Sequence, residues 1–288
     1  MNRSMSPCDP PAGGQPGSRL LTMLPAAVAF WTLTFVAAGA QQPGPSPTAG
    51  ETRIAFPGGS EMSFRHLPAG RFMMGSPVGE QDGDPDEKPV HEVVITKPFD
   101  LAVCEVTCAQ WKSVMGTLPA GVGDDPDAAV AGVTWDDCQA FIGKLRSQGI
   151  GTFRLPTEAE WEYACRAGRT ERFYWGADPD CALADDYVWH KGNAGNRARP
   201  VGTKKANAWG LHDMSGNVWE WCQDWYGPYA AGRQVDPGGP KTGTAHVFRG
   251  NGWHWEPKYC RSANRYYSEK GHAVGLRLVL ERSPETNP

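Results

Sequence analysis

The sequence predicts a single α+β domain with long irregular loops and little regular secondary structure. Three short helical segments with clear N-terminal caps lie in the first half of the expected domain, whereas strand-like segments alternate with loops after Phe173. Glycine (35), proline (25) and tryptophan (12) are abundant, which favours short strands and turns held by large aromatic side chains over a helical bundle. No repeat of about 20 to 50 residues is visible, so solenoids and propellers are excluded.

Charge and motif content exclude several functional classes. The formal net charge is -4 at pH 7 and no basic run occurs, which argues against a nucleic-acid or anionic-membrane partner. No Cys-x-x-Cys and no histidine pair at helical metal spacing is present. Ser215 follows Met214 and precedes Gly216, which is not the glycine pattern of a nucleophile elbow.

The N-terminal 40 residues predict a signal peptide. Arg3 and Arg19 precede an apolar run over 20–38, and Ala-Gly-Ala at 38–40 fits the small-residue rule for cleavage before Gln41. The run is long for a signal peptide and Pro25 interrupts it, so an uncleaved membrane anchor at 20–38 is the alternative. The protein is therefore expected to be exported, either secreted or periplasmic, and a membrane contact is expected only if this segment is retained.

Export would place the remaining cysteines where disulfides form. Their odd number leaves at least one thiol unpaired, and the sequence does not give the pairing. The seven cysteines after the predicted cleavage site are Cys104, Cys108, Cys138, Cys165, Cys181, Cys222 and Cys260.

The domain boundaries follow from changes in composition. Residues 41–60 are rich in proline, glycine and serine and predict a flexible linker. The folded domain is expected over 61–281, followed by a short tail at 282–288. An acidic loop follows a strand expected near 70–74, but Glu87 and Val93 occupy its sixth and twelfth positions, where an EF-hand needs glycine and glutamate. We interpret it as a solvated loop.

Three helices are marked by their caps. Thr107 with Gln110, and Thr157 with Glu160, form the capping-box pattern, while Thr134 begins a weaker relative of it. They predict helices over 110–115, 135–146 and 158–166. Strands are expected at 91–95 and 99–103, and later at 217–223, 246–253, 260–265 and 274–280.

The stretch 211–225 carries the most informative pattern. Residues 218–222 alternate, with Trp219 and Trp221 on one face and Glu220 on the other, which indicates a central buried strand. A buried carboxylate requires a partner. Either a hard cation shared with Asp213 or an arginine or backbone amides would satisfy Glu220.

Seven motifs occur in an order that resembles a known family. They are Gly-Arg-Phe-Met-Met-Gly at 70–75, Glu-Val-Thr at 105–107, Arg-Leu-Pro-Thr-Glu-Ala-Glu-Trp-Glu-Tyr-Ala at 154–164, Asn-Ala-Trp-Gly-Leu at 207–211, Gly-Asn-Val-Trp-Glu-Trp at 216–221, Phe-Arg-Gly at 248–250 and Gly-Leu-Arg at 275–277. Over roughly 68–280 the chain resembles the sulfatase-modifying factor, or formylglycine-generating enzyme, family. The resemblance implies one compact domain with an extended C-type-lectin-like fold.

The resemblance also implies a calcium site. In the family, calcium is held at positions that match the side chain of Asp213, the carbonyl groups of Gly216 and Val218, and the side chain of Glu220. Oxygen ligands of mixed charge suit Ca²⁺. A second calcium site of the family would fall near 186–200, where this sequence differs, and it is not carried over.

The same resemblance argues against copper. Active members carry Arg-Gly-Gly-Ser-Phe-x-Cys-x-x-x-x-Cys, whose two thiolates hold Cu(I), whereas this chain has Cys260 at the second position and Trp255 at the first. Gly252 replaces the serine. His254 is one residue from the lost ligand and would point to the opposite face of a strand. We therefore expect no copper, and a Cys260 that is buried or in a disulfide.

Aromatic side chains near the lost copper site predict a binding surface within 249–272. Packing within a loop-rich domain explains them equally well. The predicted surface comprises Trp253, His254, Trp255, Tyr259, Tyr266 and Tyr267.

Three functions remain open. The first is an exported domain that has lost copper chemistry and binds an unknown protein or small molecule. The second is a copper- and oxygen-dependent oxidase with altered ligands that acts on a cysteine of an exported sulfatase or on a phenol. The third is a display scaffold with variable ligand-binding loops, which this fold also supports. Whether the chain is an enzyme is therefore undecided at this stage.

Overall fold

The computed structural model of the protein describes residues 50–268 and 273–281. The predicted signal peptide, most of the predicted linker and the tail at 282–288 lie outside these residues. In chain order the elements are β1 (Glu51–Ala55), η1 (Pro57–Gly59), β2 (Glu61–Leu67), β3 (Gly70–Met74), η2 (Pro85–Glu87), β4 (His91–Ile95), β5 (Phe99–Ala102), α1 (Cys108–Met115), α2 (Trp135–Ser147), β6 (Phe153–Arg154), α3 (Glu158–Arg166), α4 (Ala184–Tyr187), β7 (Trp219–Trp225), β8 (Gln234–Val235), β9 (His246–Arg249), η3 (Pro257–Tyr259), β10 (Arg265–Ser268), β11 (Val274–Gly275) and β12 (Val279–Leu280).

The three predicted helices are confirmed as α1, α2 and α3. Thr107, Thr134 and Thr157 each accept a hydrogen bond from the backbone N–H three residues later, and the side chain at that later position bonds back to the cap. The cap at Thr134 is therefore complete, with Asp137 as the returning residue. Each cap satisfies backbone donors that a helix start leaves unpaired.

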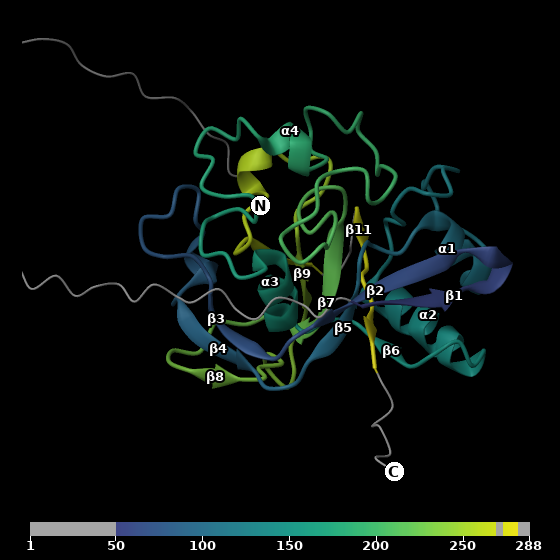
Figure 1. The fold of residues 1–288 in the computed structure, drawn as a ribbon, viewed down its shortest axis with the longest axis horizontal. Helices are drawn as coiled ribbons and strands as arrows, with labels where there is room; N and C mark the ends of the chain where they lie inside the picture. The colour runs from purple at the N-terminus through teal and green to yellow at the C-terminus, as the bar shows by residue number, and fades with distance from the viewer. Residues whose placement is uncertain (1–49, 269–272, 282–288) are drawn as a thin grey trace, which may run out of the picture. The chain divides into compact units, whose positions relative to one another are not determined.

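Three sheets form the framework of the domain. Their strand orders are β1-β2-β5-β12-β6, β10-β9-β7-β11 and β3-β4-β8. In the first sheet β12, near the end of the chain, pairs antiparallel with both β5 and β6. Helices α1 and α2 lie beside β1 and β2 (Figure 1), and the rings of Trp111 and Phe141 stack between these helices with centroids 4.9 Å apart.

Strand β7 is central and buried, as predicted. It pairs antiparallel with β9 and parallel with β11. Trp219 and Trp221 belong to one hydrophobic cluster, while Cys222 belongs to the other large cluster. The alternation of the strand therefore separates two cores, and Glu220 lies fully buried between them.

Three predicted segments are wrong. Residues Glu51–Ala55, predicted to lie in the linker, form β1, which pairs antiparallel with β2, and Ile54 packs on a core cluster, so the predicted linker extends too far at its C-terminal end. The strand predicted at 260–265 begins only at Arg265, after the short η3 helix that starts at Pro257. The strand predicted at 274–280 is two strands, β11 and β12, which belong to different sheets.

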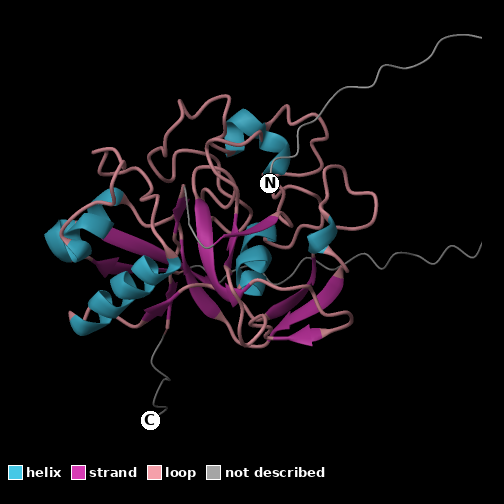
Figure 2. Ribbon diagram, turned by 180° about the vertical axis from the view of Figure 1, so that it is seen from behind, coloured by secondary structure: helices cyan, strands magenta, loops and turns pink. Residues whose placement is uncertain are grey.

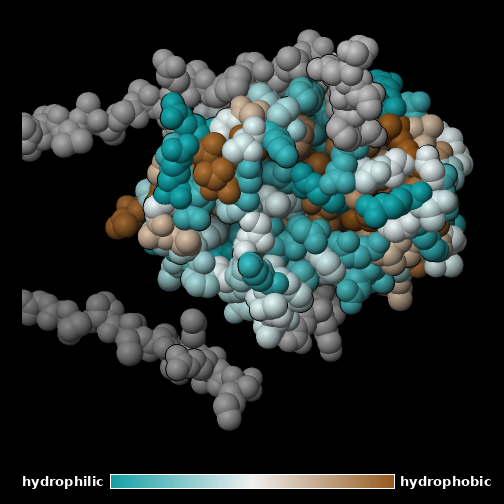
Figure 3. Space-filling view, turned by 90° about the horizontal axis from the view of Figure 1, so that it is seen from below, coloured by the Kyte–Doolittle hydropathy of each residue, from teal (hydrophilic) through white to brown (hydrophobic). Residues whose placement is uncertain are grey.

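Loops make up a large part of the domain, especially around α4, a short helix that the sequence did not predict (Figure 2). On the face shown in Figure 3, hydrophobic side chains form separate patches among hydrophilic ones. Within 50–268 and 273–281, no helix is both long and apolar enough to cross a membrane. The seven cysteines of this region are all free thiols, so the predicted disulfide is absent from it.

Candidate functional site

The buried Glu220 is paired with an arginine. Its carboxylate accepts hydrogen bonds from Arg277 Nη2 at 2.7 Å and Nε at 3.0 Å, and from Trp161 Nε1 at 2.7 Å. Burial lowers the pKa of Arg277, but the adjacent carboxylate more than offsets this effect and the pKa is raised overall. Of the partners that the sequence left open for Glu220, the structure places an arginine, Arg277, beside it.

A second pair of buried carboxylates lacks such a partner. Asp213 Oδ2 accepts the Gly202 N–H at 2.6 Å, and Glu105 Oε1 accepts a bond from Asn217 Nδ2 at 3.1 Å. Asp213 Oδ1 and Glu105 Oε2 are buried and have no hydrogen-bond partner among the described residues. Burial raises the pKa of both groups, and the charge of Asp213 raises that of Glu105 further. Such oxygens attract a cation or a proton.

Glu105 was missed by the sequence analysis as a site residue, although it belongs to a quoted motif. The sequence did contain a signal for this residue: a carboxylate directly after an apolar strand and before a helix cap is expected to be buried. The sequence could not show that Glu105 lies near Asp213.

The turn at 215–217, which follows Asp213, requires a glycine. Gly216 has φ 78°, and a Cβ there would lie 2.5 Å from the Trp189 carbonyl oxygen.

The oxygen donors suit a hard cation, with one change from the predicted set. Asp213 and Glu105 offer unpaired carboxylate oxygens, while Glu220 would first have to exchange Arg277 for the metal. Among the described residues no three His, Cys, Asp or Glu side chains are grouped as a metal site. A calcium ion would therefore also need main-chain oxygens, such as those predicted at Gly216 and Val218. Calcium stays a prediction.

The position of Cys260 does not suit a two-thiolate copper site. Its thiol is fully buried, and Asn251 Nδ2 donates to Sγ at 3.4 Å. Burial raises the pKa of Cys260 to about 12, so the thiol stays protonated at neutral pH. Trp255 packs on the other hydrophobic cluster, and His254 is exposed and contacts the rings on either side of it.

The predicted aromatic residues lie together. Their rings form a chain of contacts from Trp253 through His254 to Trp255, and from Trp255 to Tyr259 and Tyr266, with centroids 5.5 to 6.4 Å apart. Tyr266 and Tyr267 follow on β10 and are 50% and 46% exposed. We call these six side chains the aromatic face: Trp253, His254, Trp255, Tyr259, Tyr266 and Tyr267.

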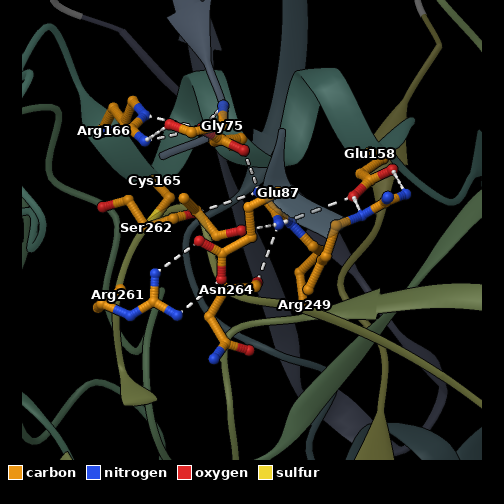
Figure 4. Close-up of polar contacts among 12 residues, drawn as sticks. Gly75, Glu87, Glu158, Cys165, Arg166, Arg249, Arg261, Ser262 and Asn264 are labelled. Carbon is orange, nitrogen blue, oxygen red and sulfur yellow. Dashed lines mark hydrogen bonds and ion pairs between the residues drawn. The ribbon is translucent and has the colours of Figure 1, made fainter. Parts of the chain in front are cut away.

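A buried ionic network supports the turn that precedes β10. Arg249 donates to the carbonyl oxygens of Ser262, Ala263 and Asn264 at 2.6 to 3.1 Å and pairs with Glu162. Figure 4 shows Arg249 and Arg261 extending into this network from neighbouring segments, with Arg261 directed at Glu87. These bonds fix the chain between η3 and β10, and so the positions of Tyr266 and Tyr267.

The sequence model of the sulfatase-modifying factor enzyme 1-like domain matches residues 59–282. The chain belongs to this family. It is 31% identical over 311 residues to the formylglycine-generating enzyme of Streptomyces coelicolor, with 84% of this chain and 94% of that protein covered. It is 32% identical over 218 residues to the Bos taurus formylglycine-generating enzyme, covering 68% of this chain and 54% of that protein.

Two solved structures have a fold similar to that of this family member. The Treponema denticola variable protein 1 matches with a TM-score of 0.70 at 24% identity, covering 82% of this chain and all of that chain. PvdO from Pseudomonas aeruginosa matches with a TM-score of 0.67 at 26% identity, covering 83% of this chain and all of that chain. The predicted α+β domain of the formylglycine-generating type is thereby confirmed.

Proposed function

We propose that this family member is an exported binding domain that engages a protein or small-molecule ligand through its aromatic face and lacks formylglycine-generating activity. The observation that carries this proposal is the pair of residues at the copper positions. Trp255 replaces one thiolate and its indole packs against Trp219 and Tyr266. Cys260, at the second copper position, is a buried thiol with a raised pKa. Cu(I) would therefore lack the two soft ligands that it prefers.

The aromatic face has the properties of a recognition surface. Tyrosine and tryptophan supply large contact area at low entropic cost, and they are enriched where binding energy is concentrated. Tyr266 and Tyr267 are half exposed while their backbone is fixed by pairing with β9. A pre-organised surface of this kind loses little entropy on binding.

Copper titration followed by a reaction test decides between binding domain and oxidase. We expect the wild type and Cys260→Ser to bind Cu(I) equally weakly in competition with a chromogenic chelator. We expect no aldehyde, by mass spectrometry, on a Cys-x-Pro-x-Arg peptide incubated with protein, copper and oxygen. Trp255→Cys should strengthen copper binding, because it restores the second thiolate. Aldehyde formed by the wild type and lost in Cys260→Ser would establish the oxidase instead.

Calcium belongs to the proposal as a structural ion at Asp213 and Glu105. If it binds there, chelation should lower the melting temperature by roughly 5 °C, since an ion at 100 times its Kd contributes about 2.7 kcal/mol. Asp213→Asn and Glu105→Gln should abolish this response to chelator. Glu256→Gln, in an exposed ion pair with Lys258, serves as the control and should respond like the wild type. A melting temperature of the wild type that chelator leaves unchanged would rule the site out.

A further inference from the structure

A cavity of about 360 Å³ lies where the ends of several elements meet, and none of the aromatic face lines it. Its walls come from the end of β7, the start of α3, strands β3, β4 and β10, and the loop over 227–240. This volume is within the range of small-molecule sites, which are about 300 to 1,000 Å³. Neither the copper positions nor the predicted calcium ligands line the cavity.

One charged pair in the cavity wall is already satisfied. Arg265 donates to both carboxylate oxygens of Glu158, from Nε at 2.7 Å and from Nη2 at 2.8 Å. The Tyr229 hydroxyl donates to the same carboxylate at 3.0 Å, and the Arg265 guanidinium lies 4.2 Å from the Tyr229 ring centroid. These contacts hold the three side chains rigidly and leave no net charge among them.

Asp224 supplies a second carboxylate, and it has no cationic partner. It is 4% exposed and accepts one hydrogen bond at Oδ2, from the Glu158 N–H at 2.9 Å. Within the described part of the chain it makes no ion pair. Four other buried carboxylates do pair with arginine: Glu87 with Arg261, Glu158 with Arg265, Glu162 with Arg166 and Arg249, and Glu220 with Arg277. Asp224 therefore gives the cavity an uncompensated negative charge when ionised.

The remaining walls are mostly apolar or aromatic. Met74, Ala159, Trp225 and Pro240 contribute apolar surface beside the carboxylate. Gly239 brings the loop close to it: a Cβ at this glycine would lie 3.0 Å from Asp224 Cβ and 3.2 Å from Oδ1. The cavity thus offers one anionic contact among apolar walls. That combination excludes a metal ion, which needs several oxygen ligands, and disfavours an anion.

We propose that this cavity binds a small organic amine, with its ammonium group on the Asp224 carboxylate and its apolar body against the Trp225 and Tyr229 side of the wall. A charge-assisted N–H···O bond in a partly desolvated site is stronger than a neutral one. Aromatic rings add favourable contact to a cation and to an apolar body. The proposal is independent of the copper and calcium sites.

Binding should depend on pH through Asp224. Burial, and then the charge of Glu158, raise the pKa of this carboxyl to about 7. An ammonium ligand prefers the ionised form, so affinity should rise about tenfold between pH 6 and pH 8. The titratable and charged groups that face Asp224 are Glu158 and Glu160 on α3, Arg154 on β6, His91 on β4, His246 on β9, Arg265 on β10 and Tyr229 in the loop. Burial lowers the pKa of His246.

The test uses phenethylamine as the probe, with 2-phenylethanol as its neutral counterpart, by calorimetry on the full chain. The wild type should bind the amine at least tenfold more tightly than the alcohol at pH 8. Asp224→Asn, which keeps an acceptor for the Glu158 N–H, should lose this preference and its pH dependence. Asp124→Asn makes the same chemical change in a second cavity of about 320 Å³ and should bind like the wild type.

Three results would overturn the proposal. One is that the wild type binds the amine and the alcohol equally tightly, or binds neither of them. Another is unchanged amine binding by Asp224→Asn whose thermal unfolding shows it to be folded. The third is a pH dependence that persists in Asp224→Asn.

Discussion

Replacing Arg277 by methionine is expected to lower the free energy of unfolding by about 3 to 5 kcal/mol. Both Arg277 and Glu220 are fully buried, and removing one partner of a buried pair leaves the other charge uncompensated. Within the part of the chain that the structure describes, Glu220 would keep only the bond from Trp161 Nε1. The carbonyl oxygens of Ala102 and His212 would also lose the donors that Arg277 provides at 2.9 and 2.8 Å. Urea unfolding at constant calcium measures the change.

Two variants separate burial from the ion pair itself. Arg154→Met breaks a bidentate pair with Glu160 in which the arginine side chain is 30% exposed, so we expect a loss of about 1 kcal/mol. Combining Arg277→Met with Glu220→Met should recover much of the stability, because it removes both buried charges. Equal losses for Arg277→Met and Arg154→Met would show that Glu220 is compensated by something else.

Local signals in the sequence were sufficient for the helices. Each of Thr107, Thr134 and Thr157 sits three residues before a side chain that returns to it, and these contacts lie within one turn. The burial of Trp219 and Trp221 also followed from a local alternation. Helix caps and strand alternation depend only on residues that are close in the chain, so the sequence pattern is sufficient to predict them.

Features that depend on distant residues were not predictable in the same way. The need of Glu220 for a partner was evident from its apolar surroundings, but Arg277 is 57 positions away. The unpaired oxygens of Glu105 and Asp213 come from segments that only the fold brings together. The strand predicted at 260–265 failed because the carbonyl groups of 262–264 bond to Arg249 in place of a neighbouring strand.

The cavity beside Asp224 could not be predicted from the sequence either. In the sequence, Asp224 is an acidic residue at the end of the central strand. Such a position suggests a solvent-exposed side chain. Its burial arises from the start of α3 and from the loop that carries Gly239, which are far apart in the chain. No sequence pattern indicates whether an arginine would pair with its charge.

Asp224 should make the stability of the protein fall as pH rises from about 4 to about 7. Its pKa in the folded protein, about 7, lies above the ordinary value of 3.8. In this range the folded state holds a proton that the unfolded state has released, and stability therefore decreases with pH. At about 1.36 kcal/mol for each pKa unit, the loss approaches roughly 4 kcal/mol at pH 8.

Asp224→Asn removes this titration while keeping the acceptor for the Glu158 N–H. We therefore expect the variant to be more stable than the wild type by about 4 kcal/mol at pH 8, with the difference closing toward pH 4, where the wild-type carboxyl is protonated in the folded state. Asp124→Asn, an exposed position, should change stability little at either pH. Chemical unfolding of the three proteins at pH 4, 6 and 8 measures these differences. Parallel stability curves for wild type and Asp224→Asn would mean that the pKa of Asp224 is the same in the folded and unfolded states, because only a difference in bound protons makes stability depend on pH.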